Sequence, residues 1–385
     1  QFFQVRPWIA FGTALLTTLE PLQLLYTRYV MTETLALLIF SVYLWCVLQY
    51  LAVPRIKWLI AIQCVATLMI SIRFAFIPMV WIGGFTIPLL AFTTVMSQKP
   101  LTDTQNTGRL AAHFILSIFL LFLFTSAYKH LHGYLQHKPP AYSYDSGFFA
   151  LADVLPIVDP ADFCDQRLGE HILSNPDFPA KDRRARSAHR WMDGGAVFRL
   201  QNIVPDRIKA DEIARKAALH AVIHKPLAFL KLGWQTFTDF FDNAYLQSCI
   251  ETDLGNFRLK EEFHRLVTIK FHYASDLSSA LDLQSPTGRY FLRSAHWFRI
   301  LLFLPIGWVL LWMLLRDNVQ RRMTMMLCLT SLICISVALF LEERPTPRYL
   351  HIAAYLFFLA VGIGWNLLLP VKKIENRATE FRCLF

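Results

Sequence analysis

Two short stretches place charged side chains where long apolar runs begin or end. In "YTRYVMTETL", Arg28 and Glu33 stand directly before a long run that carries no charge. In "LEERPTPRYL", Glu343 closes one apolar run, and Arg348 with Tyr349 opens the next. Charged side chains at membrane depth are costly, so they are usually paired, interfacial or functional. These positions are therefore the first candidates for chemistry at a membrane edge.

These residues suit a site that binds a phosphate group next to an acidic side chain. Prolines stiffen the turn before Arg348, and a guanidinium held there can bind a phosphate through two hydrogen bonds. Arg28 and Glu33 are five positions apart, about 500° around a helix, so they do not share one face. Glu33 suits a first helical turn, where the dipole favours an anion. An interfacial anchor with a helix cap explains this pair equally well, and headgroup contact explains Arg348 equally well.

The composition places these residues in a membrane protein. The chain has 385 residues, 55% of them hydrophobic, and its mean hydropathy is +0.38, so it is more apolar than a soluble domain of this length. Basic loops beside a membrane explain the formal charge of +10, and no nucleic-acid recognition motif accompanies it. We therefore expect a multi-pass membrane protein that contacts membrane lipids and does not bind nucleic acid.

Apolar runs of about 18 or more residues predict the transmembrane helices. The expected runs are 8–25, 34–53, 58–72, 74–96, 110–128, 297–315, 323–341 and 350–369. The fold class predicted is mainly α, with about seven or eight transmembrane helices and one exterior, α-rich soluble domain inserted before the last three helices. Residues 1–128 then hold the N-terminal transmembrane helices, residues 129–296 the exterior domain, and residues 297–385 three C-terminal helices with a cytoplasmic tail.

The positive charges of short loops predict the orientation. The loop around Arg321 and the tail around Lys372 are basic, which places both on the cytoplasmic side. Alternation along the chain then places "PRIK" inside, and it places Arg73, "YTRYVMTE" and "EERPTPR" outside. The polar helix ends are therefore expected to share the exterior face with the soluble domain.

The expected exterior domain contains one amphipathic pattern, in residues 211–241. We expect Pro226 to kink or end this helix, and its aromatic second half suits a membrane interface. The basic run at 181–190 is expected to be a solvated or headgroup-facing patch. Cys164 and Cys249 are the cysteines of this domain, and the sequence leaves open whether they form a disulfide or remain two buried thiols. No cysteine or histidine spacing in the sequence matches a closed zinc site.

Three motifs resemble those of the GT-C class of polytopic glycosyltransferases, which use polyprenyl-phosphate-linked sugars. This class includes the protein O-mannosyltransferases and the aminoarabinose transferase. "LLYTRYVMTETLALLIF" is similar to the family's arginine and acidic residue that open an apolar helix. "ALHAVIHKPLAFLKLGW" is similar to the amphipathic segment before the closing helices of bacterial members. "ERPTPRYLHIAAYLFFLAVG" is similar to the late Arg-Tyr turn that opens a terminal span.

The resemblance implies transfer of a sugar from a polyprenyl-phosphate carrier to an acceptor on the exterior face of the membrane. A bacterial inner membrane is favoured over an endoplasmic reticulum membrane. Arg348 is expected to contact the phosphate, with Arg28 and Arg73 as further candidates. Tyr349 and Glu343, which flank the same turn, complete the expected substrate contacts.

The resemblance also implies a general base that activates the acceptor, and Glu33 is expected to be a supporting acid. The family's principal catalytic aspartate lies in a first exterior loop. That loop and the first two helices are missing from this sequence, so the principal base is not among its residues. Nothing in the sequence requires a metal or a cofactor other than the lipid-linked donor, although a divalent ion held by the missing loop is consistent with the resemblance.

Two other functions remain open. A non-catalytic membrane subunit would scaffold a larger complex through the exterior domain and would bind membrane partners. A transporter or flippase is the third reading. The lack of acidic residues near the middle of the expected spans counts against it, because coupling sites usually lie there.

Overall fold

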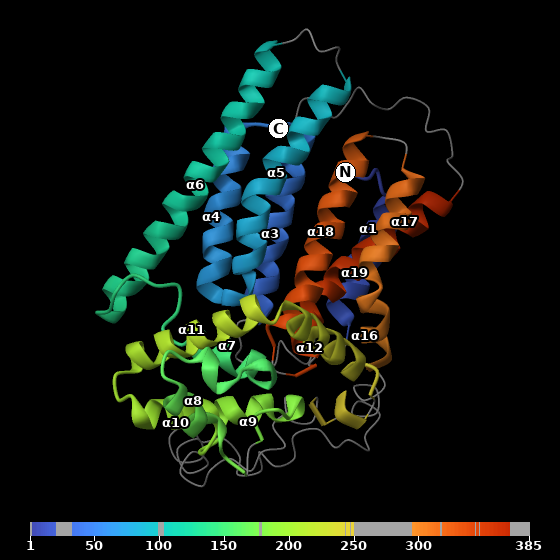
Figure 1. The fold of residues 1–385 in the computed structure, drawn as a ribbon. Helices are drawn as coiled ribbons and strands as arrows, with labels where there is room; N and C mark the ends of the chain where they lie inside the picture. Colours follow the sequence, from blue (N-terminus) through green and yellow to red (C-terminus); the bar gives the residue numbers. More distant parts are fainter. Residues whose placement is uncertain are drawn as a thin grey trace, which may run out of the picture.

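The protein is a bundle of apolar helices that rests on a layer of shorter helices (Figure 1). The computed structural model describes residues 2–20, 33–98, 104–176, 179–242, 244–246, 248–249, 295–315, 318–342, 344–345 and 347–369. These residues form helices and turns, and the described part of the chain contains no β-strand. The expected mainly α-helical class is therefore confirmed.

The bundle contains the apolar helices of both halves of the chain. They are α1 (Pro7–Leu19), α3 (Glu33–Ala52), α4 (Ile56–Ile72), α5 (Ile77–Gln98), α6 (Thr104–Gln136), α16 (Ala295–Leu302), α17 (Leu304–Leu314), α18 (Asn318–Phe340) and α19 (Pro347–Leu368), with a 3-10 turn, η1 (Phe74–Phe76), before α5. The facing sides of α3, α4, α5, α6, α17, α18 and α19 form one hydrophobic core, and α16 packs in a second, smaller cluster with α18 and α19. Many large apolar side chains on the outer sides of the bundle remain exposed. An apolar exterior of this kind is expected of helices that lie in lipid.

Four stretches are long and apolar enough to cross a membrane. They are Thr34–Ala52, Phe74–Ala91, Ala111–Gln136 and Val319–Phe340. The bundle's other apolar stretches are shorter: Pro7–Leu19, Ile56–Ile72, Leu304–Leu314 and Ile352–Leu368. The protein is thus a multi-pass membrane protein by the length and composition of four described helices. The larger number of spans expected from the sequence stays a prediction.

Three expected helices differ in their limits from those of the structure. The run at 297–315 is divided at Phe303 into α16 and α17, because Pro305 occupies the first turn of α17 and cannot continue the helix before it. Helix α6 continues past the expected boundary at residue 128 and ends at Gln136. Helix α1 ends at Leu19, before the interrupting Glu20 and Pro21.

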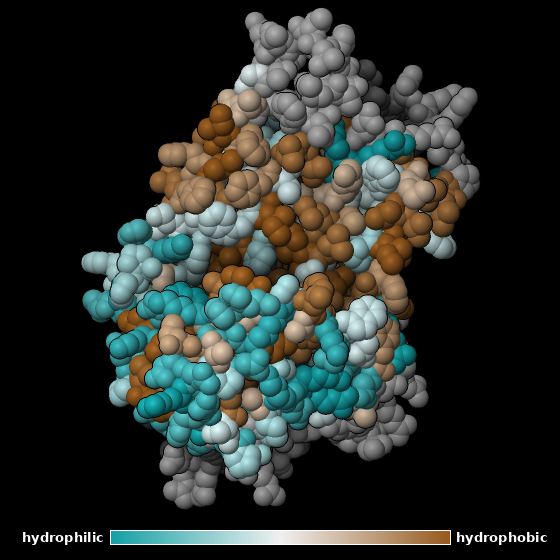
Figure 2. Space-filling model, viewed as in Figure 1, coloured by the Kyte–Doolittle hydropathy of each residue, from teal (hydrophilic) through white to brown (hydrophobic). Residues whose placement is uncertain are grey.

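The second part of the structure, which we call the polar layer, lies across one end of the bundle. It consists of α7 (Ser146–Val154), α8 (Gln166–Leu173), α9 (Arg186–Trp191), α10 (Ala196–Ile203), α11 (Arg207–His224) and α12 (Pro226–Asp239), with the 3-10 turns η2 (Leu155–Ile157), η3 (Pro160–Asp162) and η4 (Arg183–Ala185). Figure 2 shows a hydrophilic surface over this layer and a hydrophobic one over the bundle. The polar layer has its own hydrophobic core, formed largely by α7 and the alanine face of α11.

The expected amphipathic helix is two helices in the structure. Helix α11 ends at His224, Lys225 adopts a non-helical conformation, and Pro226 begins α12. The prediction that Pro226 ends or kinks the helix is confirmed. The break lets α11 pack on α7, while α12 packs against the end of α18.

The two ends of the bundle differ in their charged residues. Arg55 and Lys57 stand at the start of α4, and Arg321 and Arg322 near the start of α18, at the end away from the polar layer (Figure 1). Arg73, after α4, lies at the opposite end, which we call the layer end. The basic residues at the starts of α4 and α18 thus lie at the end opposite to Arg73, as the alternation of loops along the sequence predicts.

Candidate functional site

Three helix ends with polar residues meet at the layer end. Glu33 is the first residue of α3, Arg73 connects α4 to η1, and Arg348 and Tyr349 lie in the first turn of α19. The structure gives the backbone of Glu33, Arg348 and Tyr349 but does not describe their side chains. Two other predicted site residues, Arg28 and Glu343, lie outside the described residues.

Aromatic contacts show that these three helix ends are neighbours. The ring of Phe40 in α3 stacks on that of Phe76 in η1, with centroids 6.1 Å apart. The same ring meets the edge of Tyr355 in α19 at 6.4 Å. Phe76 follows Arg73 by three residues, and Tyr355 lies two turns after Arg348. The structure therefore brings the start of α3, the Arg73 connection and the start of α19 together.

Arg73 lies half-buried against the helices that close this group. It caps the end of α4 in an extended conformation, and its amide donates to the Met69 carbonyl at 2.9 Å. Its side chain lines a small cavity of about 30 Å³ together with α5, α18 and Ile352 of α19. Ile352 is one turn after Arg348, so Arg73 lies beside the beginning of α19.

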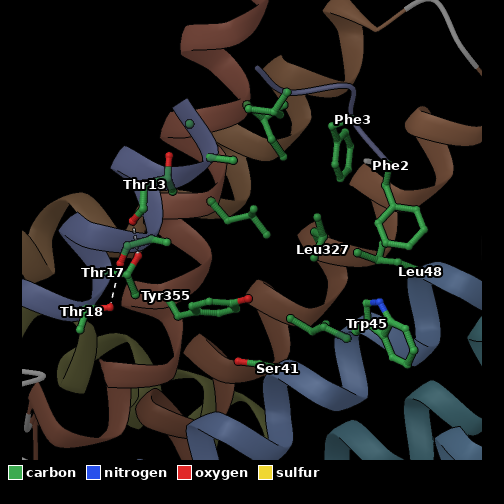
Figure 3. A pocket seen from close by; sticks show the side chains of 17 residues that line it. Phe2, Phe3, Thr13, Thr17, Thr18, Ser41, Trp45, Leu48, Leu327 and Tyr355 are labelled. Atoms are coloured by element: carbon green, nitrogen blue, oxygen red, sulfur yellow. Dashed lines mark hydrogen bonds between the residues drawn. The ribbon is translucent and has the colours of Figure 1, made fainter. Parts of the chain in front are cut away.

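A larger cavity, of about 440 Å³, lies inside the bundle between α1, α3, α18 and α19 (Figure 3). Its wall includes the rings of Phe2, Phe3, Trp45 and Tyr355. Tyr355 also contacts Phe40, so the wall of the cavity continues through one aromatic contact toward the layer end.

Three hydroxyl groups in this cavity are already hydrogen-bonded within their own helices. The hydroxyls of Thr17 and Thr18 donate to carbonyls one turn earlier in α1, at 2.8 and 2.9 Å. The hydroxyl of Ser41 does the same in α3 at 2.8 Å. Because these polar groups are satisfied, the space offers mainly apolar contact and suits a hydrocarbon chain better than a polar ligand.

The polar layer touches the bundle most closely where α12 meets the end of α18. A Cβ atom at position 233 would overlap the ring of Phe340, so Gly233 permits this approach. The ring of Phe229 lies 5.2 Å from the same Phe340 ring, centroid to centroid. The layer is thus packed on the helix that leads directly into the α18–α19 turn.

Arg186 of α9 joins the layer to that turn through its guanidinium. Its side chain is buried, with 1% of the residue exposed. Nε donates to the carbonyl of Arg183 at 2.9 Å, and Nη2 donates to Oγ1 of Thr236 at 2.9 Å. Nη1 donates to the carbonyls of Asp153 at 3.1 Å and Glu342 at 3.2 Å. Oxygen atoms from four separate segments therefore accept hydrogen bonds from one guanidinium.

The rest of the basic run is also engaged within the layer. Arg183 pairs with Asp239, and Arg184 pairs with Asp242 at 2.7 Å and lies over the ring of Tyr245 at 4.5 Å. Burial raises the pKa of the Tyr245 hydroxyl to about 12, so this group stays neutral. The expectation of a solvated or headgroup-facing basic patch is wrong for Arg186, which is buried. Arg184 stays half-exposed and Arg183 is partly buried, and aspartates of α12 and the following turn pair with both.

Lys225, between α11 and α12, is the centre of a second polar cluster. Nζ donates to carboxylate oxygens of Asp159 at 2.7 Å and Asp162 at 2.6 Å, and Asp162 also pairs with His220 at 2.8 Å. Hydrogen bonds from Lys181 and Lys225 lower the pKa of Asp159. Burial acts to raise the pKa of Asp162, but hydrogen bonds, with that from Lys225 foremost, outweigh it and lower this pKa. These contacts hold the junction between α11 and α12.

The two cysteines of the expected exterior domain do not form a disulfide. Cys164 is exposed and Cys249 is buried, and both are thiols. Cys164 lies near Lys216 of α11, whereas Cys249 lies near Tyr245 in the segment after α12. The pairing fails because the two cysteines belong to different parts of the polar layer. The alternative of two buried thiols holds for Cys249 alone.

Within the described ranges, no group of three His, Cys, Asp or Glu side chains converges as metal ligands would. The chemistry that this part of the molecule offers is cation-based binding at the layer end beside an apolar interior.

Sequence reasoning missed three residues that shape this region. Arg186 was included in a run interpreted as solvated, and Tyr355 was an ordinary aromatic residue of a predicted span. Thr236 was one polar residue of an aromatic segment. A helical projection of α12 places Thr236 with buried Leu232 and Gly233, which is the signal that would have marked it as an inward-facing partner.

The chain matches no protein-family model, and no curated protein or solved structure matches it. The class that the described structure defines is a mainly α-helical, multi-pass membrane protein with a polar layer at one end of its bundle.

Proposed function

We propose that this protein is a membrane glycosyltransferase of the GT-C type, which moves a sugar from a polyprenyl-phosphate carrier to an acceptor. The observation that carries the proposal is the convergence of Glu33, Arg73 and the first turn of α19 at one end of a bundle with an apolar cavity. A lipid phosphate needs cationic groups at the membrane edge and apolar space below them.

In this proposal the cations bind the donor's phosphate. Arg348 holds the phosphate with Tyr349 beside it, and Arg73 and Arg28 add positive charge. When the acceptor oxygen forms its bond to the sugar's anomeric carbon, the bond to the phosphate oxygen breaks and its electron pair leaves with the phosphate. The proton of the acceptor hydroxyl passes to a general base. Arginine stabilises this departing charge more strongly in the transition state than in the ground state.

The acidic residues serve the acceptor. Glu33, at the positive end of the α3 dipole, orients the acceptor hydroxyl or amine as a supporting acid, and Glu343 contacts the substrate from the α18–α19 turn. The reaction would take place on the exterior face, with a bacterial inner membrane as the favoured location. The proposal assigns no metal to the described residues.

Arg348→Ala tests this function directly. Membranes carrying the protein are incubated with a panel of radiolabelled polyprenyl-phosphate hexoses and pentoses, and labelled acceptor is measured. We expect a rate loss of about 100-fold, because the variant loses a donor that stabilises the leaving charge. Lys57→Ala, at the other end of the bundle, is the matched control and should keep full activity. Normal transfer by Arg348→Ala would refute the assignment of Arg348.

A second candidate is a non-catalytic subunit that scaffolds a membrane complex. It is favoured by exposed apolar side chains on α11 and α12: Leu219 57%, Ile223 62%, Leu227 79%, Leu230 55% and Trp234 64% exposed. Within each helix these positions recur at helical spacing, and apolar faces of this kind can receive a partner helix. A scaffold predicts loss of a co-purifying partner when Leu227 and Trp234 are both changed to serine, and no effect of Arg348→Ala.

A further inference from the structure

We propose that Arg186 is a positioning residue, which fixes the α18–α19 turn against the polar layer so that α19 begins in the correct place. The inference rests on the proposed function, because Arg348, assigned to the donor phosphate, lies in the first turn of α19. Arg186 itself touches neither donor nor acceptor in this scheme.

The first support is the way in which Arg186 is buried. A guanidinium removed from water must have its N–H groups hydrogen-bonded, or its burial costs several kilocalories per mole. Arg186 meets this requirement with acceptors from α7, η4, α12 and the end of α18. Three of these acceptors belong to the polar layer, and the fourth, the Glu342 carbonyl, belongs to the turn. The cation therefore links two parts of the molecule that are distant in sequence.

The second support is the position of Glu342. This residue is 8% exposed and follows α18 directly, and α19 begins at Pro347 only five residues later. A turn this short has little freedom once one carbonyl is fixed, and its prolines restrict it further. The hydrogen bond from Arg186 thus limits where the first turn of α19 can lie.

The third support is geometric specificity. The planar guanidinium donates from Nε, Nη1 and Nη2 in three directions, and here each direction reaches a different segment. A lysine ammonium carries the same charge but is a point donor on a flexible stem, so it cannot reach all four acceptors. Arg186→Lys should therefore leave the charge in place and still release the turn.

Matched variants distinguish positioning from general support of the layer. Thr236→Val removes one acceptor inside the layer and leaves the contact with Glu342 intact. Arg184→Gln removes a neighbouring, half-exposed cation that pairs with Asp242. If Arg186 acts on the turn, both controls should differ from the Arg186 variants in kcat, even where they lower thermal stability.

The experiment uses the full chain in lipid nanodiscs and has two readouts. The first is amide hydrogen exchange of peptides covering 341–350, compared with peptides from α3 and α5. The second is the split between kcat and KM for the polyprenyl-phosphate sugar that the wild type uses. For Arg186→Lys and Arg186→Gln we expect faster exchange in 341–350 alone and a kcat lowered by about tenfold or more, with KM changed less, since a displaced Arg348 no longer stabilises the leaving charge, and this stabilisation acts chiefly in the transition state. Both control variants should stay within about twofold of the wild type.

Unchanged exchange in 341–350 for a folded Arg186→Lys protein would overturn the proposal, as would a kcat equal to that of the wild type. If Arg186→Gln does not fold, Arg186→Lys carries the test. A third result separates the two proposals: the wild type transfers no sugar, but the Arg186 variants show faster amide exchange in 341–350 alone. The proposed function would then be wrong, while the role of Arg186 in fixing the turn would be supported.

Discussion

The bundle and the polar layer are both helical, but they satisfy their polar groups in different ways. In the bundle, hydroxyls such as those of Thr67, Thr125 and Thr330 donate to the carbonyl one turn earlier in the same helix, at 2.9, 2.6 and 2.8 Å. In the layer, aspartates cap the starts of helices: Asp165 accepts from the Arg167 amide at 2.9 Å. Many hydroxyls of the bundle thus bond within their own helix, although Ser117 of α6 donates to the Gly84 carbonyl of α5. Charged side chains of the layer cap helices and also join different segments, as Arg183 and Asp239 do.

The difference follows from the surroundings of each part. In a hydrocarbon environment, no water satisfies a polar atom, so the nearest carbonyl of the same helix is the safest partner. In water, a side chain can cap a helix end or pair with an opposite charge at modest cost. The two parts of the chain therefore satisfy their polar groups according to their surroundings. They meet at the layer end, where Arg186 donates a hydrogen bond to the Glu342 carbonyl.

The largest expected effect is that of a charge on the outer side of the bundle. Phe119 in α6 is 59% exposed and lies near the middle of an apolar stretch. Phe119→Arg should cost about 3 kcal/mol, the cost of an arginine at the centre of a membrane helix. The measurement is the fraction of protein that integrates into membranes, with Phe119→Leu as the control.

Leu219→Arg, on an exposed position of α11, is the counterpart in the layer and should change integration little. An equal loss from Leu219→Arg would break the comparison, because it would place α11 in the same apolar environment as α6.

The second effect concerns close packing in the layer. A Cβ atom at Gly147 would overlap the Asp211 carbonyl oxygen of α11, whereas no atom lies within 4 Å of one at Gly307 in α17. Gly147→Ala should lower the free energy of unfolding by about 2–3 kcal/mol. Gly307→Ala should raise it by about 0.5 kcal/mol, because alanine has the higher helix propensity. Thermal unfolding in detergent measures both, and a stable Gly147→Ala protein would contradict the close α7–α11 packing.

The third effect compares a helix cap with a hydroxyl of the bundle. Asp206 accepts from the Ile208 amide at 3.0 Å, and Ser331 donates to the Leu327 carbonyl at 2.8 Å. Asp206→Ala should cost about 1 kcal/mol, since it leaves helix amides without their cap. Ser331→Ala should change the free energy of unfolding by less than about 0.5 kcal/mol, because the carbonyl keeps its helical hydrogen bond. Similar losses from both, measured by chemical denaturation, would remove the distinction drawn between the two regions.

The smallest expected effect is a loss of stability that occurs only at acidic pH. The folded-state pKa values of Asp159 and Asp162 are lowered, so the stability that they contribute is present above the pKa of the unfolded chain, about 4. This stability is lost as the pH falls below about 4 and the carboxylates are protonated. Asp162→Asn should show a shallower acid loss than the wild type in thermal unfolding between pH 6 and 3. An unchanged acid profile would mean that the contact with Lys225 contributes nothing to stability.

The fold was predictable where a single physical requirement dominates. Uncharged apolar runs long enough for a bilayer predicted α3, α5 and α18 closely, and Pro226 predicted the break before α12. The division at Phe303 was missed, because a run of apolar residues hides a proline that begins a new helix. The candidate site was predicted only as a set of helix ends. That Arg73 lies beside α19 depends on packing between segments far apart in the sequence, which no local pattern encodes.

The partners of the basic run were unpredictable for the same reason. Arg183 and Asp239 pair across 56 positions of the chain. No pattern in the sequence near either residue identifies the other as its partner. The sequence left the pairing of Cys164 and Cys249 open for a related reason: two cysteines in one predicted domain say nothing about their distance.

The hydrogen bond between Arg186 and Glu342 also has a consequence for the assembly of the protein during its synthesis. Its two residues are 156 positions apart. At about 5–20 residues per second, a ribosome needs roughly 10–30 s to reach the second after making the first. During that interval one acceptor of the guanidinium, the Glu342 carbonyl, has not yet been made. The hydrogen bond that ties the layer to the α18–α19 turn therefore forms only after α18 has been synthesised, so this attachment is a late step in the assembly of the protein.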